Sequence, residues 1–297
     1  MTRVLLPDGV LGMADRDEAW ADWVARLPKR TEGLLDEWVL TTDGLSVHGY
    51  TSLVTPVRDE DDQPLVLKVT FDGDDESEHE GLALQRWGGR GAVRMVRADP
   101  GRRALLLERL HPTDLSELWD IEACEVVAGL WRDLHVPAMP QLRSLSSYVE
   151  RWVGELADLP TNGPVPARLV QQATAHTRDL LAGPEATDTV IHGDLHYDNV
   201  LAADRADWLA IDPKPMNGDR HYEVAPMLWN RVEELAGDVR GGLRRRFETL
   251  VDAADLDEDR ARAWVVVREV LNAAWAAEDG DADGVTTAVT VAKSVEK

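Results

Sequence analysis

Three polar side chains in the second half of the chain have types and spacing suited to phosphoryl transfer. Asp194 lies in the stretch VIHGDLHYDNVL, after a short β-like run and a glycine, and Asn199 follows on the same loop. Asp212 ends the apolar run of WLAIDPK. Phosphoryl transfer needs a carboxylate that orients the attacking hydroxyl and oxygen ligands that hold Mg²⁺ against the phosphates. These three residues supply both kinds of group.

A lysine in the first third of the chain also needs a chemical explanation. Lys68 lies within the apolar strand-like run PLVLKVT, where an unpaired ammonium group would cost several kcal/mol. A carboxylate partner is therefore required, and Glu80, in the helical stretch that follows, can supply it. Glu76 and Glu78 lie in the same stretch and remain alternatives.

Two histidines near the loop aspartate raise a different chemistry. His192 and His196 together with Asp194 suggest a metal hydrolase, but two imidazoles and one carboxylate make an incomplete metal site. We interpret His192 as a residue that holds the loop through hydrogen bonds. Cys124 is the one cysteine of the chain, which excludes an internal disulfide and a cysteine-based zinc site. Its helical surroundings favour a buried structural residue over a catalytic thiol.

The first third of the chain reads as β-rich, with acidic Gly/Asp turns between short runs of Val, Leu and Thr that fit antiparallel hairpins. One helix, 76–88, interrupts the strands and ends at a glycine pair. The predicted strands are 38–41, 45–48, 51–57 and 64–70, followed after the helix by 93–98 and 103–108.

After residue 108 the pattern changes to helical spacing of Leu, Val, Ala and Trp. An irregular segment, 188–219, holds the candidate chemistry between two short β-like runs, and Pro112 marks the boundary between the β-rich and helical parts. The predicted helices are 117–135, 145–158, 166–182, 221–236, 240–254 and 258–278.

The charge of the chain bounds its partners. A net charge of −23 repels phosphate backbones and anionic membrane surfaces, so we expect no nucleic-acid or membrane partner. A cationic small molecule would be attracted, although acidic residues also serve solubility. No apolar run approaches the roughly 18 residues that span a membrane, and the first residues are too acidic for a secretory signal, so a cytoplasmic protein is expected.

The motifs HGDLHYDN and IDPK resemble the catalytic and metal motifs of aminoglycoside phosphotransferases. The likeness extends over about 80–231 and is similar to the branch containing streptomycin 6-phosphotransferases and hydroxyurea phosphotransferases. It includes RWGGRGAVRM, LLLERL, LWRDLHVPA and GDRHYEVAPMLWN. Protein kinases fit less well, because Pro213 and Lys214 follow the metal aspartate here.

The resemblance implies an α+β, bilobal, protein-kinase-like fold, with an antiparallel β N-lobe containing one helix and a mainly α-helical C-lobe. The N-lobe, 1–107, would bind ATP, 108–113 would be the hinge, and 114–297 would hold the catalytic loop and the acceptor site. By the same resemblance Asp194 is the catalytic base, and Asn199 and Asp212 are the Mg²⁺ ligands.

The resemblance also assigns the nucleotide-binding residues. Lys68 would bridge the α- and β-phosphates while Glu80 holds it. The segment HGYTSLVTPV takes the place of the loop over the phosphates, with one glycine where protein kinases have three, and its backbone N–H groups could cradle phosphate oxygens. An ordinary hairpin turn is the alternative. The expected loop residues are Tyr50, Thr51 and Ser52, and the expected hinge contacts to adenine are backbone groups of Glu108 and Leu110.

The acceptor is expected to lie between the catalytic loop and the helices that follow it. Carboxylates there could pair with a guanidinium or ammonium group, which predicts a preference for a cationic acceptor over a neutral one. The alternative is that these acids are solvated residues at helix ends. The candidate residues are Asp219, Glu223, Trp275, Glu278 and Asp279.

The expected activity is transfer of the γ-phosphoryl group of ATP to a hydroxyl of a small polar molecule, as in antibiotic inactivation of a streptomycin-like aminoglycoside or of hydroxyurea. A metabolic kinase for an amino sugar is an alternative within the same chemistry. A catalytically silent nucleotide-binding pseudokinase is a second alternative, which the set Lys68, Asp194, Asn199 and Asp212 opposes. The oligomeric state stays open.

Overall fold

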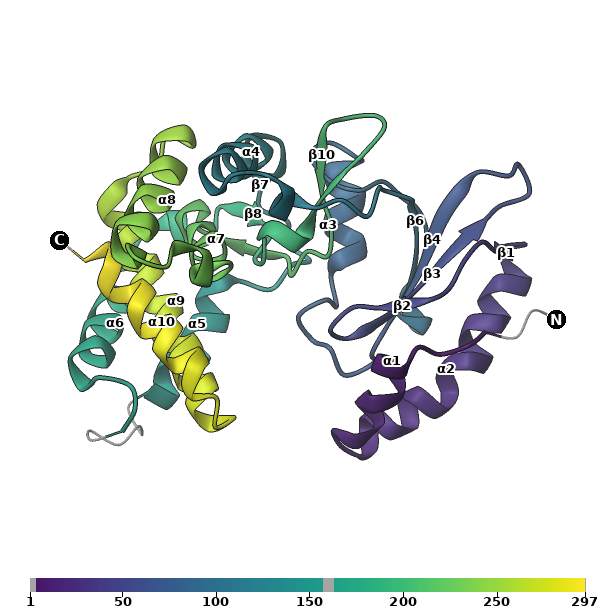
Figure 1. The fold of residues 1–297 in the computed structure, drawn as a ribbon, viewed down its shortest axis with the longest axis horizontal. Coiled ribbons are helices and arrows are strands. Elements are labelled where there is room, and N and C mark those ends of the chain that lie inside the picture. The colour runs from purple at the N-terminus through teal and green to yellow at the C-terminus, as the bar shows by residue number, and fades with distance from the viewer. Residues whose placement is uncertain (1–3, 157–162, 297) are drawn as a thin grey trace. The chain divides into compact units, whose positions relative to one another are not determined.

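The computed structural model describes residues 4–156 and 163–296 of the chain (Figure 1). The chain divides into two compact units, Met1–His111 and Pro112–Lys297, which we call unit 1 and unit 2. The division lies within the segment 108–113 that the sequence predicts as the hinge. No helix in the described ranges is long and apolar enough to cross a membrane.

Unit 1 is built on an antiparallel sheet with the strand order β1-β3-β4-β6-β5. Strand β2 pairs with the N-terminal end of β3. Its strands are β1 (Thr41–Thr42), β2 (Val47–His48), β3 (Ser52–Arg58), β4 (Pro64–Thr70), β5 (Met95–Asp99) and β6 (Ala104–Glu108). The hairpins follow the predicted order. The strand expected at 38–41 begins later, because Trp38 still caps a helix and Val39 has a φ of 55°.

One face of this sheet packs on a long helix that precedes it. Helix α2 (Glu18–Glu37) follows the short α1 (Asp8–Gly12), and Asp17 caps its first turn by accepting the N–H of Trp20. Its apolar stripe joins the sheet in one core, which includes Trp23, Leu27, Leu34, Leu53, Leu67 and Leu106. The prediction of a single helix in this part was therefore incomplete. Pro28 and Gly33 interrupt the helical pattern that the stripe would otherwise have shown.

The other face of the sheet packs on α3 (Glu80–Trp87), the helix that the sequence predicts between the strands. Side chains alternate along a strand, so Lys68 points away from the face that carries Leu67 and Val69. Lys68 lies opposite Leu105 in the β4–β6 register, and a Cβ on Gly81 would meet Leu105 at 3.3 Å. A glycine in α3 thus allows the helix to approach this face closely.

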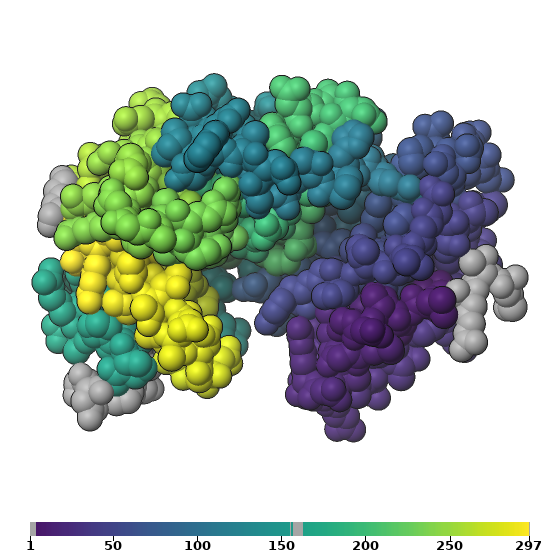
Figure 2. Space-filling model, viewed as in Figure 1, coloured from purple at the N-terminus to yellow at the C-terminus, as the bar shows by residue number. Residues whose placement is uncertain are grey.

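Unit 2 is mainly helical, and its C-terminal helix lies on the face seen in Figure 2. Its helices are α4 (Asp120–Leu134), α5 (Leu145–Leu156), α6 (Ala167–Leu180), α7 (Pro226–Trp229), α8 (Val239–Ala253), α9 (Glu258–Glu278) and α10 (Ala282–Val295). Helix α9 is buried nearly all round, which makes it the central helix of the unit. Helix α10 was not predicted, and its first turn is capped by Asp281, which accepts the N–H of Gly284.

Two small antiparallel sheets frame the segment that holds the candidate chemistry. Strand β8 (Thr189–Ile191) lies between β7 (Val136–Pro137) and β11 (Met216–Gly218), and β9 (Val200–Ala202) pairs with β10 (Trp208–Ala210). The polar loop between β8 and β9 is therefore anchored at both ends.

The helix predicted over 221–236 is broken in the structure. It consists of a 3₁₀ turn at Arg220–Val224, then α7, then a second 3₁₀ turn at Val232–Leu235. Pro226 starts α7, and Asn230 is extended with a ψ of 145° before Arg231 takes a φ of 57°. Apolar spacing over this stretch does not detect these backbone changes, which orient the segment toward the catalytic loop.

Candidate active site

The loop that carries Asp194 depends on a glycine. Gly193 has a φ of +84°, in the left-handed region that favours glycine, and a Cβ there would lie 2.3 Å from the carbonyl oxygen of Lys214. The backbone therefore passes directly beside the segment that follows Asp212. This close approach brings the loop aspartate and the strand aspartate into one region of unit 2.

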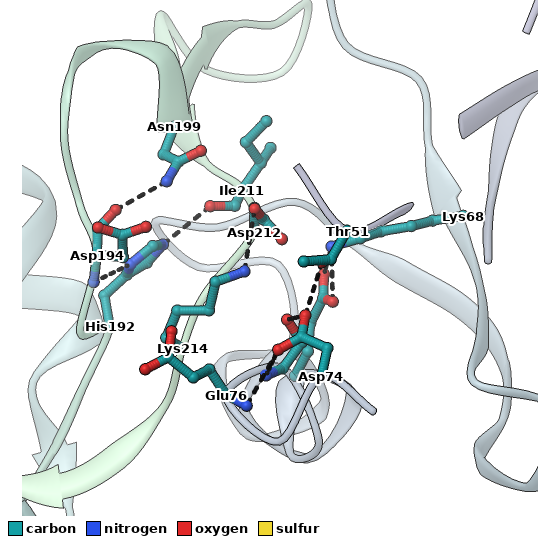
Figure 3. A network of polar contacts seen from close by, with 12 residues as sticks. Thr51, Lys68, Asp74, Glu76, His192, Asp194, Asn199, Ile211, Asp212 and Lys214 are labelled. Atoms are coloured by element: carbon teal, nitrogen blue, oxygen red, sulfur yellow. Dashed lines mark hydrogen bonds and ion pairs between the residues drawn. The ribbon is translucent and has the colours of Figure 1, made fainter. Parts of the chain in front are cut away.

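His192 holds this loop in the way that the sequence suggests. Its Nε2 donates to the carbonyl of Ile211 at 3.0 Å, and its Nδ1 lies 3.3 Å from the N–H of Asp194 (Figure 3). A carbonyl can only accept and an N–H can only donate, so these contacts require the neutral ring with the proton on Nε2. Complete burial lowers the pKa of His192 to about 4, against the opposing pull of Glu223. The ring is therefore a neutral structural bridge.

Asn199 is bonded both to the catalytic loop and to Ile211, the residue that precedes Asp212. The side-chain nitrogen of Asn199 donates to the carbonyl of Asp194 at 2.8 Å, which turns its carbonyl oxygen away from that contact. Its backbone carbonyl accepts the N–H of Ile211 at 2.9 Å. Asp212 has a φ of +53°, an uncommon conformation for a residue with a side chain. Its Oδ2 accepts a hydrogen bond from Lys214 Nζ at 3.2 Å (Figure 3).

The carboxylate of Asp194 lies near a histidine ring and an arginine guanidinium. His196 Nε2 lies 3.9 Å and Arg268 Nη2 lies 3.8 Å from its oxygens. Burial raises the pKa of Asp194, while His196, Arg268 and Lys214 oppose that rise and Asp212 adds to it. Arg268 and Lys214 favour the ionised form that can accept a proton from a hydroxyl, whereas burial favours the protonated form.

In unit 1 the structure pairs Lys68 with Glu80. Lys68 Nζ lies 2.8 Å and 2.7 Å from the two carboxylate oxygens of Glu80, and the two residues are only 6% and 2% exposed. Glu76 and Glu78, the alternative partners, are both exposed. The pair is therefore buried and bidentate, which orients the ammonium group of Lys68 in the sheet.

The predicted phosphate loop is the turn between β2 and β3. Thr51 donates from Oγ1 to Asp74 at 2.7 Å, and its carbonyl accepts the N–H of Phe71 at 2.8 Å. Tyr50 is 81% exposed, and the Arg16 guanidinium lies 4.8 Å from the centre of its ring. Ser52 is buried as the first residue of β3. The turn is thus braced from two sides, by Arg16 and by Asp74.

The end of β6 carries the predicted hinge residues. The N–H of Glu108 donates to the carbonyl of Arg94 at 2.9 Å, so its contact with adenine would have to use the carbonyl. Leu110 is half-buried. Between them, Arg109 ties the segment to the sheet through Asp43 at 2.8 Å and the carbonyl of Leu65 at 3.1 Å.

Two of the predicted acceptor residues are buried within unit 2. Both oxygens of Asp219 are bonded, one to His221 and the other to Trp264 and Arg260 at 2.6 Å and 2.5 Å. Burial raises the pKa of Asp219, but the hydrogen bonds from His221 and Trp264 outweigh it and lower the pKa overall.

Glu223 is engaged in the same way. One of its oxygens accepts the N–H of Gly193 at 2.7 Å, and the other lies 2.9 Å from His135 Nε2. It is fully buried, and the bonds to His135 and Gly193 lower its pKa against burial. These contacts argue against direct acceptor binding by Asp219 or Glu223. Glu223 supports the loop through Gly193, whereas Asp219 joins His221 to Trp264 and Arg260 of α9.

The remaining predicted acceptor residues lie at the C-terminal end of α9. Glu278 and Asp279 are exposed, and Trp275 is half-buried. Trp275 packs edge-on against Trp152 with ring centroids 5.2 Å apart, and Tyr148 lies beside Trp152. The structure thus separates this aromatic and acidic group from the buried pair Asp219 and Glu223.

The sequence did not single out Arg268, although it lies as close to Asp194 as His196 does. Its signal was the same as that of Lys68, a cation inside an apolar run, AWVVVREVL. His135 was missed as well, because its role depends on contact with Glu223, far away in the sequence.

One carboxyl group on α9, that of Glu269, is buried with an incomplete set of hydrogen-bond partners. Glu269 is 1% exposed, and its Oε2 has no hydrogen-bond partner within the described residues, while Oε1 accepts from Asn272 at 3.4 Å. Burial raises the pKa of Glu269 from 4.5 to about 8, opposed by Arg268. The folded chain therefore keeps this carboxyl protonated at neutral pH.

Glu269→Gln is expected to remove a pH-dependent loss of stability. Between pH 4.5 and about 8 the unfolded chain releases this proton and the folded chain retains it, so stability falls as pH rises. The difference is at most about 5 kcal/mol. The variant should match wild type in urea unfolding near pH 5 and exceed it at pH 8 to 9. A constant difference between the two proteins across this range would contradict the assignment.

Comparisons with known proteins agree over most of the chain. The family of aminoglycoside/hydroxyurea antibiotic resistance kinases matches residues 37–280. A streptomycin 6-kinase of Streptomyces glaucescens is 39% identical, with 92% of this chain and 90% of that protein covered. A hydroxyurea phosphotransferase of Kitasatospora aureofaciens is 38% identical, with 89% and 77% covered.

Solved structures share the fold at low identity. A choline kinase of Streptococcus pneumoniae superposes with a TM-score of 0.62 at 12% identity, covering 89% of this chain and 96% of that one. An aminoglycoside phosphotransferase in complex with ADP and hygromycin B gives 0.60 at 16% identity, covering 89% and 97%. The predicted protein-kinase-like fold is confirmed. This chain belongs to the aminoglycoside/hydroxyurea antibiotic resistance kinases and is a small-molecule phosphotransferase that uses ATP.

Proposed function

We propose that this protein inactivates an antibiotic by transferring the γ-phosphoryl group of ATP to a hydroxyl of a streptomycin-like aminoglycoside, with hydroxyurea as the rival acceptor. The observation that carries the proposal is the loop of unit 2, in which Asp194 follows the neutral His192 and Asn199 bonds back to the Asp194 carbonyl. Relatives that phosphorylate streptomycin and hydroxyurea support this choice of acceptors.

The chemistry assigned to Asp194 is general-base positioning. The hydroxyl oxygen of the acceptor forms a bond to the γ-phosphorus, the bond from that phosphorus to the ADP oxygen breaks, and the hydroxyl proton passes to the Asp194 carboxylate. The adjacent Arg268 guanidinium supports the ionised carboxylate before the transfer. ATP is supplied in the cytoplasm, where we place the reaction.

We assign nucleotide binding to unit 1. Lys68, held by both oxygens of Glu80, is proposed to contact the α- and β-phosphates. The braced turn of Tyr50, Thr51 and Ser52 is proposed to cover the phosphates through its backbone. We retain the carbonyl of Glu108 and the backbone of Leu110 as proposed adenine contacts.

Asn199 and Asp212 are the proposed Mg²⁺ ligands, and their oxygen donors suit this ion. Within 4–156 and 163–296 no cluster of three or more His, Cys, Asp or Glu side chains is arranged to hold a metal. A site of one amide and one carboxylate agrees with the preference of Mg²⁺ for few protein ligands, with phosphate and water completing its shell. Bound there, the ion would neutralise phosphate charge.

Asn199→Ala and Asp212→Ala are expected to raise the Mg²⁺ concentration needed for half-maximal activity. Asp212→Ala should have the larger effect, because it removes a charge as well as a ligand. Magnesium titrations of the initial rate check this at saturating ATP. Titration curves that superpose on wild type in both variants would remove these residues from the metal site.

The proposed acceptor residues are Trp275, Glu278 and Asp279 at the exposed end of α9. The test of the function is ADP release with streptomycin, hydroxyurea, other aminoglycosides and amino sugars as acceptors, followed by mass determination of the product. Turnover of streptomycin with a gain of one phosphoryl group supports the proposal. Turnover confined to an amino sugar would indicate a metabolic kinase, and ATP binding without turnover of any acceptor would indicate a pseudokinase.

A further inference from the structure

Arg268 occupies an unusual place beside the catalytic loop. It projects from the buried helix α9, and its side chain is 10% exposed. Its Nη2 donates to the carbonyl of Gly193 at 2.8 Å and lies 3.8 Å from Asp194 Oδ1. The guanidinium therefore contacts the residue that precedes the proposed base and lies close to the base itself.

Two aromatic rings hold this guanidinium in place. Its central carbon lies 4.5 Å from the ring centre of Tyr222 and 4.8 Å from that of Trp229. A planar guanidinium can stack on rings while it donates hydrogen bonds in its plane, which an ammonium group cannot do. The 3₁₀ turn and α7 that replace the predicted helix thus provide the surface against which Arg268 is oriented.

The backbone of Gly193 is bonded on one side to the 3₁₀ turn and on the other to α9. Its N–H donates to Glu223 at 2.7 Å, and its carbonyl accepts from Arg268 at 2.8 Å. The Gly193 carbonyl belongs to the peptide that leads into Asp194, so a shift of this carbonyl rotates the backbone that carries the carboxylate. Nη1 of Arg268 has no hydrogen-bond partner within the described residues, which leaves the Gly193 contact as its directed bond.

We propose that Arg268 is a positioning residue for phosphoryl transfer, which sets the orientation of the Asp194 carboxylate through the Gly193 carbonyl and through its charge. It acts on the acceptor only through Asp194. The proposal rests on the function proposed above for Asp194, and it adds a residue of α9 to the groups on which the turnover depends.

Arg268→Ala is expected to lower kcat about 100-fold, the effect of a displacement of roughly 1 Å in a reacting group, with the KM for ATP within about twofold of wild type. Millimolar guanidinium chloride should restore part of kcat, whereas urea, a neutral molecule of similar shape, should not. The matched control is Arg262→Ala on the same helix, where the side chain is 15% exposed and pairs with Glu258 and Asp259. It should show no change in kcat with guanidinium.

If Arg268→Ala does not fold, Arg268→Lys serves in its place, because it retains the charge without the stacked plane. Its kcat should fall at least about tenfold at a temperature where circular dichroism shows a folded chain. Wild-type kcat in either folded variant, or equal responses to guanidinium and urea, would reduce Arg268 to a packing residue. If Asp194→Asn is also fully active, the proposed function fails; if only that variant is inactive, the inference about Arg268 alone fails.

Discussion

Asp194→Asn is expected to lower turnover by about a hundredfold to ten-thousandfold, the usual range for removing a positioned acid or base. Asparagine has nearly the same shape, and its side chain cannot accept a proton from the acceptor hydroxyl. The loop itself should persist, because it is held by backbone contacts of Gly193, His192 and Asn199. Nucleotide affinity should change little, so kcat and kcat/KM for the acceptor should fall together.

The matched control is Asp198→Asn on the same loop. The side chain of Asp198 is 65% exposed and lies 3.7 Å from His196, so this change removes the same charge without touching the proposed base. Initial rates at saturating ATP, with nucleotide affinity measured separately by calorimetry, give the comparison. Near-normal turnover in Asp194→Asn would show that this carboxylate is not the base.

Lys68→Met and Glu80→Gln are each expected to destabilise unit 1 by about 3–5 kcal/mol, because each leaves a buried charge without its partner. The double variant should lose less than the sum of the two, since it leaves neither charge behind. Lys68→Met should also weaken ATP binding if Lys68 contacts the phosphates. The slowly exchanging amides of β4 and α3 provide the measurement, because the two units need not unfold together.

An exposed ion pair of the same unit supplies the control. Arg26 and Asp72 are 3.4 Å apart with side chains 60% and 36% exposed, and Arg26→Met should cost no more than about 1 kcal/mol. Additive losses in the two Lys68 and Glu80 variants would contradict a coupled pair. Equal protection of β4 amides in Lys68→Met and Arg26→Met would place Lys68 at the surface.

The sequence by itself determined the class of fold and the local chemistry. Alternation in the strands and the 3.6-residue period after residue 108 depend on short-range order, so the hairpins and most helices followed from them. The loop from His192 to Asn199 is local as well, because its glycine, histidine and asparagine bond to one another over a few residues. A lysine in an apolar strand required a carboxylate partner, and the family resemblance pointed to Glu80 among the three glutamates of the following stretch.

The tertiary structure alone decided which acids are buried in hydrogen bonds within the protein and which cations reach the catalytic loop. Asp219 and Glu223 looked like acceptor ligands in the sequence, but contacts with Trp264 and His135 bury them. Arg268 comes within reach of Asp194 only when α9 packs against the segment 220–229. Which side chains are buried, and which distant residues they bond to, depends on how the helices pack. The charge and spacing of residues along the chain do not predict this packing.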